Sequence, residues 1–168
     1  MTPRAFLPLI LAQAALATVV MAASQMAGPL VVINETTSMR RGAYVRTGDA
    51  AAPAVGQVVA LPLGGPAMAY LHDRLGYPVD TMLVKRVAGA PGDAVCRAGG
   101  VVRVGVRVVE ARMSDHRGNT LAIWSGCHRL KSGEVFLLGD APTSFDGRYF
   151  GPTPVAALVG TYREVLTW

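Results

Sequence analysis

Ser38 and Lys85 are the two residues of this chain whose side chains, if brought together, would cleave a peptide bond. A serine hydroxyl is a weak nucleophile at neutral pH unless a neighbouring base removes its proton. Lysine acts as that base only as a neutral amine, and burial among apolar residues favours this form by lowering the pKa. Leu83, Val84 and Val87 flank Lys85 and would supply such surroundings. The pair therefore predicts a peptide hydrolase, and an ordinary surface lysine is the alternative interpretation of Lys85.

A long apolar segment precedes Ser38. Residues 5–23 carry no charge and Gln13 is their one strongly polar member, so the segment is long enough to cross the hydrocarbon layer as a helix. Arg4 lies before it, which predicts a cytoplasmic N-terminus and export of everything that follows. We expect a transmembrane anchor at residues 1–27 and one periplasmic domain at residues 28–168. The alternative is a cleaved secretory signal, because Ala15-Leu16-Ala17 has the small-x-small pattern that cleavage requires.

The exported part alternates short apolar, β-branched runs with turn residues. Hydrophobic residues make up 51% of the chain and charged residues 16%, a balance too apolar for disorder. Only residues 67–76 have helical spacing, with Met68, Leu71 and Leu75 three and four positions apart. We therefore predict a mainly β fold, a single antiparallel domain around one core. The predicted strands are residues 29–33, 57–63, 81–87, 101–110, 121–124, 134–138 and 155–165.

The two cysteines, Cys96 and Cys127, both fall in the exported part, where oxidation is permitted. We predict that they form a disulfide. Closing a loop of about thirty residues would stabilise the fold by roughly 3 to 4 kcal/mol. A metal site is not expected, because only His116 and His128 lie near the cysteines and no CxxC spacing occurs.

The formal net charge of +5 is mild, and the arginines are scattered along the chain rather than interleaved with aromatic residues. This pattern argues against nucleic-acid binding. Arg40, Arg41 and Arg46 follow the apolar segment closely, which would suit contact with anionic lipid headgroups of the inner membrane. A solvated basic surface explains the same residues.

A Ser-His-Asp triad would need a histidine in a suitable setting. His72 lies in the helical segment, His116 lies beside a turn and His128 lies beside Cys127. Surface or structural roles fit these positions better. Residues 89–93 lack the glycine spacing and the Gly-Lys-Ser/Thr sequence of a phosphate-binding loop, so no cofactor is predicted.

Three blocks in the chain resemble sequence motifs of the type I signal peptidases, and more narrowly of the TraF peptidases that mature conjugative pilin subunits. The blocks are residues 36–39 with Gly42, residues 85–93, and residues 139–148. The TraF likeness depends on residues 133–139, residues 144–152 and the short chain. Two departures concern substrate choice more than chemistry: Arg40-Arg41 stands where a proline is usual, and the third block is about one residue shorter between Gly139 and Ser144.

The resemblance implies a signal-peptidase-like β-rich domain and a role for each matching residue. Ser38 would be the nucleophile and Lys85 the general base. The Thr36 hydroxyl would join the Ser38 amide in the oxyanion hole, although a turn-capping threonine is also common. Ser144 would orient the lysine amine. Asp146 and Arg148 would brace the site and pair with each other, since an unpaired carboxylate near Lys85 would raise the lysine pKa.

The implied substrate is a membrane-delivered precursor, bound as an extended strand along an exposed sheet edge. For a TraF-like enzyme this precursor is a conjugative pilin, and an amine instead of water would release a cyclic product. A general type I signal peptidase that removes leader peptides is the first alternative. The second is a non-catalytic envelope protein that scaffolds a secretion apparatus, in which Ser38 and Lys85 are merely structural.

Overall fold

The computed structural model describes residues 13, 28–121 and 124–168. The anchor predicted at residues 1–27 therefore lies outside the described residues, apart from Gln13. Within the described ranges, no helix has both the length and the apolar character needed to span a membrane.

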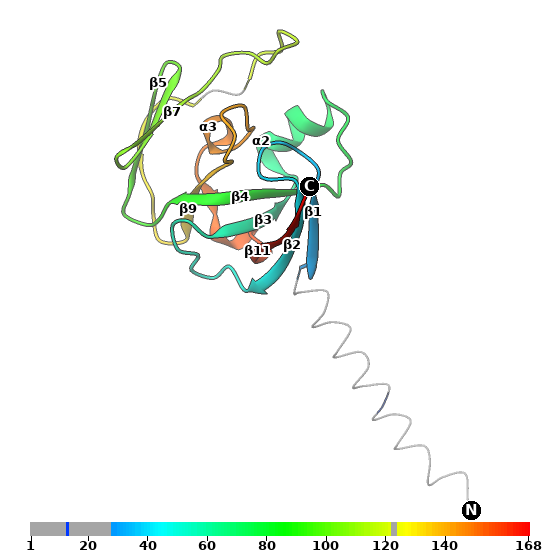
Figure 1. Cartoon of the computed structure of the whole chain (residues 1–168). Coiled ribbons are helices and arrows are strands. Elements are labelled where there is room, and N and C mark those ends of the chain that lie inside the picture. Colours follow the sequence, from blue (N-terminus) through cyan, green and yellow to red (C-terminus); the bar gives the residue numbers. More distant parts are fainter. Residues whose placement is uncertain (1–12, 14–27, 122–123) are drawn as a thin grey trace, which may run out of the picture.

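The described residues form two antiparallel sheets, and the larger one contains strands from both ends of the domain (Figure 1). Its seven strands lie in the order β1-β2-β11-β3-β4-β9-β10, so three of the six neighbouring pairs join strands that are not consecutive in sequence. The predicted mainly β antiparallel fold is confirmed. The strands are β1 (Val31–Asn34), β2 (Gly42–Gly48), β3 (Val58–Pro62), β4 (Met82–Gly89), β9 (Glu134–Leu138), β10 (Thr153–Pro154) and β11 (Gly160–Thr167).

The smaller sheet has four strands in the order β7-β6-β5-β8 and stands to one side of the larger sheet (Figure 1). Cys96 on β5 faces Cys127 on β8, and the two form the predicted disulfide across 31 positions of sequence. The strands are β5 (Ala94–Ala98), β6 (Val101–Val104), β7 (Arg107–Glu110) and β8 (Gly126–Arg129).

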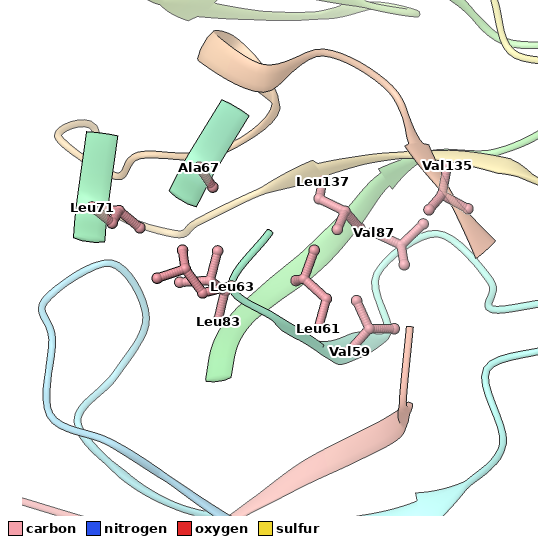
Figure 2. Close-up of a cluster of buried hydrophobic side chains, with 9 residues drawn as sticks. All are labelled: Val59, Leu61, Leu63, Ala67, Leu71, Leu83, Val87, Val135 and Leu137. Carbon is pink, nitrogen blue, oxygen red and sulfur yellow. The ribbon is translucent and has the colours of Figure 1, made fainter. Parts of the chain in front are cut away.

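Strand β9 joins the hydrophobic clusters on its two sides. Its side chains alternate between the faces: Val135 and Leu137 belong to a cluster with β3 and β4, and Phe136 and Leu138 belong to the cluster under the smaller sheet. All four are at most 1% exposed, which explains why β9 reads as a continuous apolar run. Figure 2 shows the first cluster, with Ala67 and Leu71 from two short helices beside the strands.

Several element boundaries differ from the predicted ones. The strand predicted at 101–110 is the hairpin β6–β7, because Gly105 takes a φ of +56° and turns the chain. The sequence did not predict β2, β5 or β8. Leu121 and Trp124 lie outside any strand, and residues 122–123 are outside the described residues.

The predicted helix at 67–76 is present as two short pieces, α2 (Gly65–Ala67) and the π-helix η2 (Met68–His72), followed by turns. The predicted strand at 155–165 divides into the 3-10 helix η3 (Val155–Ala157) and most of β11. One further short helix, α3 (Gly147–Phe150), follows β9 after a loop. This loop and the β1–β2 loop approach each other at the candidate site.

Candidate active site

Ser38 lies in the loop between β1 and β2, and Asn34 holds this loop in shape. Asn34 is the last residue of β1 and is only 6% exposed. Its Nδ2 donates hydrogen bonds of 2.9 to 3.2 Å to the main-chain oxygens of Thr36, Met39 and Arg40. The sequence analysis missed Asn34. Asparagine commonly bonds nearby main chain at turns, and its place four residues before the serine was the available signal.

Lys85 lies in the middle of β4 and is 2% exposed. Its Nζ donates a hydrogen bond of 3.1 Å to Ser38 Oγ, so the two predicted residues are brought together. Because side chains alternate along a strand, Lys85 shares its face with Leu83 and Val87, which belong to the cluster in Figure 2. The expectation that Val84 also flanks the amine was wrong, since Val84 points to the other face and packs in the cluster around Tyr44.

Burial lowers the pKa of Lys85 from 10.5 to about 8, because the ammonium loses its hydration. The nearby Asp146 carboxylate opposes this effect, Arg148 adds to it, and Asp140 acts weakly against it. The result is a lysine that becomes a neutral amine only slightly above neutral pH. Such a pKa suits a general base.

Asp146 and Arg148 form the pair that the sequence predicted. Arg148 Nη2 lies 2.7 Å from Asp146 Oδ2, and the two side chains are 3% and 0% exposed. Asp146 also accepts from the main-chain nitrogens of Gly139 and Arg148, at 2.7 and 3.1 Å. Arg148 in turn donates to the main-chain oxygens of Ala141 and Pro142. The pair therefore fixes the loop after β9, whose Ala141 N–H donates to the Ser38 carbonyl at 3.2 Å.

Ser144 is buried beside the lysine but does not make the expected hydrogen bond. Its Oγ has no hydrogen-bond partner among the described residues, although both side chains line the same cavity. Gly139 allows the close packing here: a Cβ on it would lie 2.2 Å from Ser144 Oγ and 2.6 Å from the Ser38 carbonyl oxygen. Only glycine fits between these groups.

A chain of hydrogen bonds runs from Lys85 to Asn34. Thr36 Oγ1 lies 2.8 Å from Ser38 Oγ and donates to Asn34 Oδ1, also at 2.8 Å. The Asn34 amide cannot be reversed, because its nitrogen faces three carbonyl oxygens. A threonine hydroxyl has one proton, so Ser38 must donate to Thr36 while Lys85 donates to Ser38. In this state the Ser38 proton points away from the lysine.

The cavity that contains Ser38 and Lys85 has a volume of about 480 Å³. One wall is an aromatic stack in which Phe145 lies between Tyr70 and Tyr149, with ring centroids 4.6 and 5.1 Å apart. The Tyr70 hydroxyl donates to Asp115 at 2.8 Å and so holds the loop that forms the far wall. The sequence analysis did not identify these wall residues.

The floor of the cavity includes a stretch of β4 with free main-chain groups. Strand β9 pairs with β4 only from Arg86 onward. Leu63 N–H donates to Thr81 O, and Val87 N–H donates to Gln57 O. Every second residue of an antiparallel strand bonds to the same neighbouring strand, so in this register the main-chain groups of the odd-numbered residues of β4 bond to β3. The N–H and C=O groups of Met82 and Val84 therefore point towards the cavity, where they meet no strand of the described part.

The three histidines do not contact Ser38 in the described residues. His72 Nδ1 lies 2.6 Å from the Tyr77 carbonyl oxygen, and His128 pairs with Glu134 at 2.8 Å. His116 lines the cavity at its far wall. In the ranges that the structure describes, no three His, Cys, Asp or Glu side chains cluster closely enough to hold a metal ion.

In this antiparallel β fold, one cavity brings a serine hydroxyl within hydrogen-bond distance of a buried lysine amine, an arrangement that would suit a serine peptidase. The family described as "Signal peptidase, peptidase S26" matches residues 4–168, and the chain belongs to this family.

Curated relatives carry the TraF name. The chain is 40% identical over 91 residues to a plasmid transfer protein TraF of Escherichia coli, a match that covers 51% of each chain. It is 35% identical over 88 residues to the conjugal transfer protein TraF of Agrobacterium fabrum, covering 51% of this chain and 49% of that protein. The chain thus spans about half the length of the curated relatives it matches. The resemblance to TraF-like signal peptidases is confirmed.

Among solved structures, a signal peptidase I from Enterococcus faecalis V583 aligns with 65% of this chain and 95% of its own, at 19% identity and a TM-score of 0.38.

Proposed function

We propose that this protein is a membrane-anchored endopeptidase in which Ser38 attacks the scissile carbonyl and Lys85 is the general base. The observation that supports the proposal most is the distance of 3.1 Å between Lys85 Nζ and Ser38 Oγ, at a lysine that is 2% exposed. An ordinary surface lysine would keep its amine in water.

The reaction begins when Lys85 is neutral. The Ser38 proton turns from Thr36 to Lys85 Nζ, and Ser38 Oγ then attacks the carbonyl carbon. We assign two donors to the developing oxyanion: the Ser38 main-chain N–H, and the Thr36 hydroxyl when its proton turns from Asn34. Lys85 passes its proton to the leaving amine, which leaves an acyl-enzyme on Ser38. Water or a second amine resolves this ester and regenerates the serine.

The substrate binds as an extended strand against β4. The inward-pointing main-chain groups of Met82 and Val84 offer an N–H and a C=O each, as an added strand requires. Both residues line the cavity that contains Ser38. A peptide paired there places a carbonyl beside the serine hydroxyl.

The domain lies in the periplasm, held at the bacterial inner membrane by the apolar segment at residues 5–23. Exposed apolar side chains near the first described residues support contact with lipid, since Leu30, Val31 and Ile33 are 74%, 51% and 52% exposed. The exposed Arg40 would meet anionic headgroups. Such a site acts on peptides that emerge from the bilayer.

The relatives are named as plasmid and conjugal transfer proteins, and we propose on this basis that the precursor is a conjugative pilin. If the pilin's own amine resolves the acyl-enzyme, the product is a cyclic peptide. The test incubates the purified full chain, in detergent, with a candidate pilin precursor. Mass spectrometry then separates a trimmed linear product from a cyclic one, which is lighter by one water.

Matched variants decide the chemistry. Ser38→Ala and Lys85→Met should each abolish cleavage, and joint replacement of His72, His116 and His128 should spare it. Cleavage that persists in Ser38→Ala would refute the proposed nucleophile and favour a structural role for the two residues.

The family match also favours a second candidate, a general signal peptidase that removes leader peptides. A precursor of an unrelated exported protein, offered beside the pilin, separates the two functions. Equal cleavage of both substrates would favour the general enzyme.

A further inference from the structure

Arg97 lies in the smaller sheet, on β5 next to the disulfide, and is 2% exposed. Its Nη1 donates to the main-chain oxygen of Arg148 on α3. Its Nε donates weakly to Gly99 O at 3.4 Å, and its guanidinium lies 5.8 Å from the centre of the Tyr149 ring. Arg97 thus makes its main polar contacts with the helix that carries the site's buried arginine.

Arg148 connects this contact to the nucleophile. Its side chain holds Asp146 and the main-chain oxygens of Ala141 and Pro142. The N–H of Ala141 donates to the Ser38 carbonyl at 3.2 Å. Every step from Arg97 to the Ser38 loop is therefore a hydrogen bond or an ion pair between buried or partly buried groups.

Burying a guanidinium is unfavourable unless its donors are satisfied. Arg97 Nη2 is buried and has no acceptor among the residues that the structure describes. An apolar side chain would fill this space at lower cost to stability. A role in shaping the site explains why an arginine occupies the position.

We propose that Arg97 is a positioning residue of the active site, which anchors α3 so that Arg148 stays paired with Asp146 beside Lys85. The Cys96–Cys127 disulfide supports this anchor, because it ties β5 to β8 one residue before Arg97. The smaller sheet then acts as a rigid support for the catalytic loop. The inference rests on the proposed Ser38/Lys85 chemistry.

Loss of the anchor has a specific electrostatic consequence. The charged groups that act on Lys85 are Asp146, Arg148 and Asp140. When Arg148 moves away, the Asp146 carboxylate is less well neutralised and favours the ammonium form of Lys85. The lysine then needs a higher pH to become neutral, so the acid limb of the rate profile moves to higher pH.

The experiment compares Arg97→Met and Arg97→Lys with Arg103→Met in the full chain, using precursor cleavage between pH 6 and 10. Arg103 is an exposed arginine on β6 of the same sheet. We expect Arg97→Met to lose about ten- to a hundredfold in kcat, with KM nearly unchanged and the acid limb raised by about half a pH unit or more. Arg97→Lys, which keeps a charged donor, should recover part of kcat, and Arg103→Met should match the wild type.

The outcomes separate this inference from the proposed function. If the Ser38→Ala variant cleaves the precursor as fast as the wild type does, the catalytic proposal itself is refuted. Loss of cleavage in Ser38→Ala, together with equal kcat and pH profiles for Arg97→Met and Arg103→Met, would overturn the role of Arg97 alone. Failure of both Arg97 variants to fold, judged by thermal melting, would assign the residue to stability and also overturn the inference.

Discussion

Replacing Lys85 with methionine is expected to abolish cleavage and, at neutral pH, to stabilise the fold. Methionine fills nearly the same volume without a charge. Lys85 has a pKa of about 8 in the folded protein against 10.5 in its ordinary state. Each pH unit between the two values corresponds to about 1.4 kcal/mol. The buried ammonium therefore destabilises the native protein by about 3 kcal/mol at pH 7.

The pH dependence fixes the sign of this effect. The folded pKa is the lower one, so between pH 8 and 10.5 the unfolded chain binds more protons and wild-type stability rises with pH. Below pH 8 the full penalty is present, and at pH 10.5 less than about 0.5 kcal/mol remains. The advantage of Lys85→Met over the wild type should thus shrink by about 3 kcal/mol from pH 7 to pH 10.5.

Urea denaturation of both proteins at pH 7 and pH 10.5 measures the difference in unfolding free energy between Lys85→Met and the wild type. The contributions of groups that titrate in both proteins cancel in this difference. Lys131→Met is the matched control, because Lys131 is exposed and should show no such change. A Lys85→Met advantage that is equal at pH 7 and pH 10.5 would refute the argument that burial produces the neutral amine. In the wild type, the rate of cleavage should rise with pH, since only about a tenth of Lys85 is neutral at pH 7.

Val84→Pro removes an N–H that points into the cavity and not towards β3, so the fold should survive. The value of kcat/KM should fall about five- to tenfold, mainly through a higher KM, and an unchanged KM would argue against substrate pairing at Val84. Gly139→Ala forces a Cβ against Ser144 and the Ser38 carbonyl oxygen, so kcat should drop at least about tenfold in a folded protein, as steady-state kinetics can measure. Asp146→Ala leaves Arg148 buried without its partner and should lose activity and about 3 to 5 kcal/mol of unfolding free energy; full activity would remove Asp146 from the site. Replacing both cysteines with serine should lower the unfolding free energy by roughly 3 to 4 kcal/mol, and a non-reducing urea titration that matches the wild type would contradict this.

The sequence predicted the strands whose apolar residues are contiguous and missed those whose pattern is mixed. The predicted limits of β9 matched the structure, because Val135 to Leu138 are buried on both faces. Strand β8 was missed because Gly126–Arg129 is mostly exposed and has a weak apolar pattern. It is held in place instead by the Cys96–Cys127 disulfide and by pairing with β5. Local pattern does not carry such long-range constraints.

Ser38 and Lys85 were singled out in the sequence because of their settings. Lys85 is a lysine in an apolar run, and Ser38 lies in a block that resembles a motif of the signal peptidases. The role of Arg97 depends on a partner that only the fold supplies, whereas the place of Asn34 before the serine was a local signal that the sequence analysis missed. Asn34 bonds main chain in its own loop, whereas Arg97 reaches Arg148 across 51 positions of sequence. Ser144 shows the opposite case, since the resemblance implied a hydrogen bond that its buried Oγ does not make within the described structure.

The open edge of β4 has a consequence for how selectivity arises. Every residue of a bound peptide except proline would present the same amide to Met82 and Val84. Main-chain pairing at this edge therefore does not distinguish one side chain from another. If the substrate pairs with β4 as proposed, selection among substrates must come from the width of the cavity beside Ser38 and from how the polypeptide is delivered to it. A peptide designed as a substrate would therefore need an extended, unhindered backbone at this edge more than it would need a particular sequence of side chains.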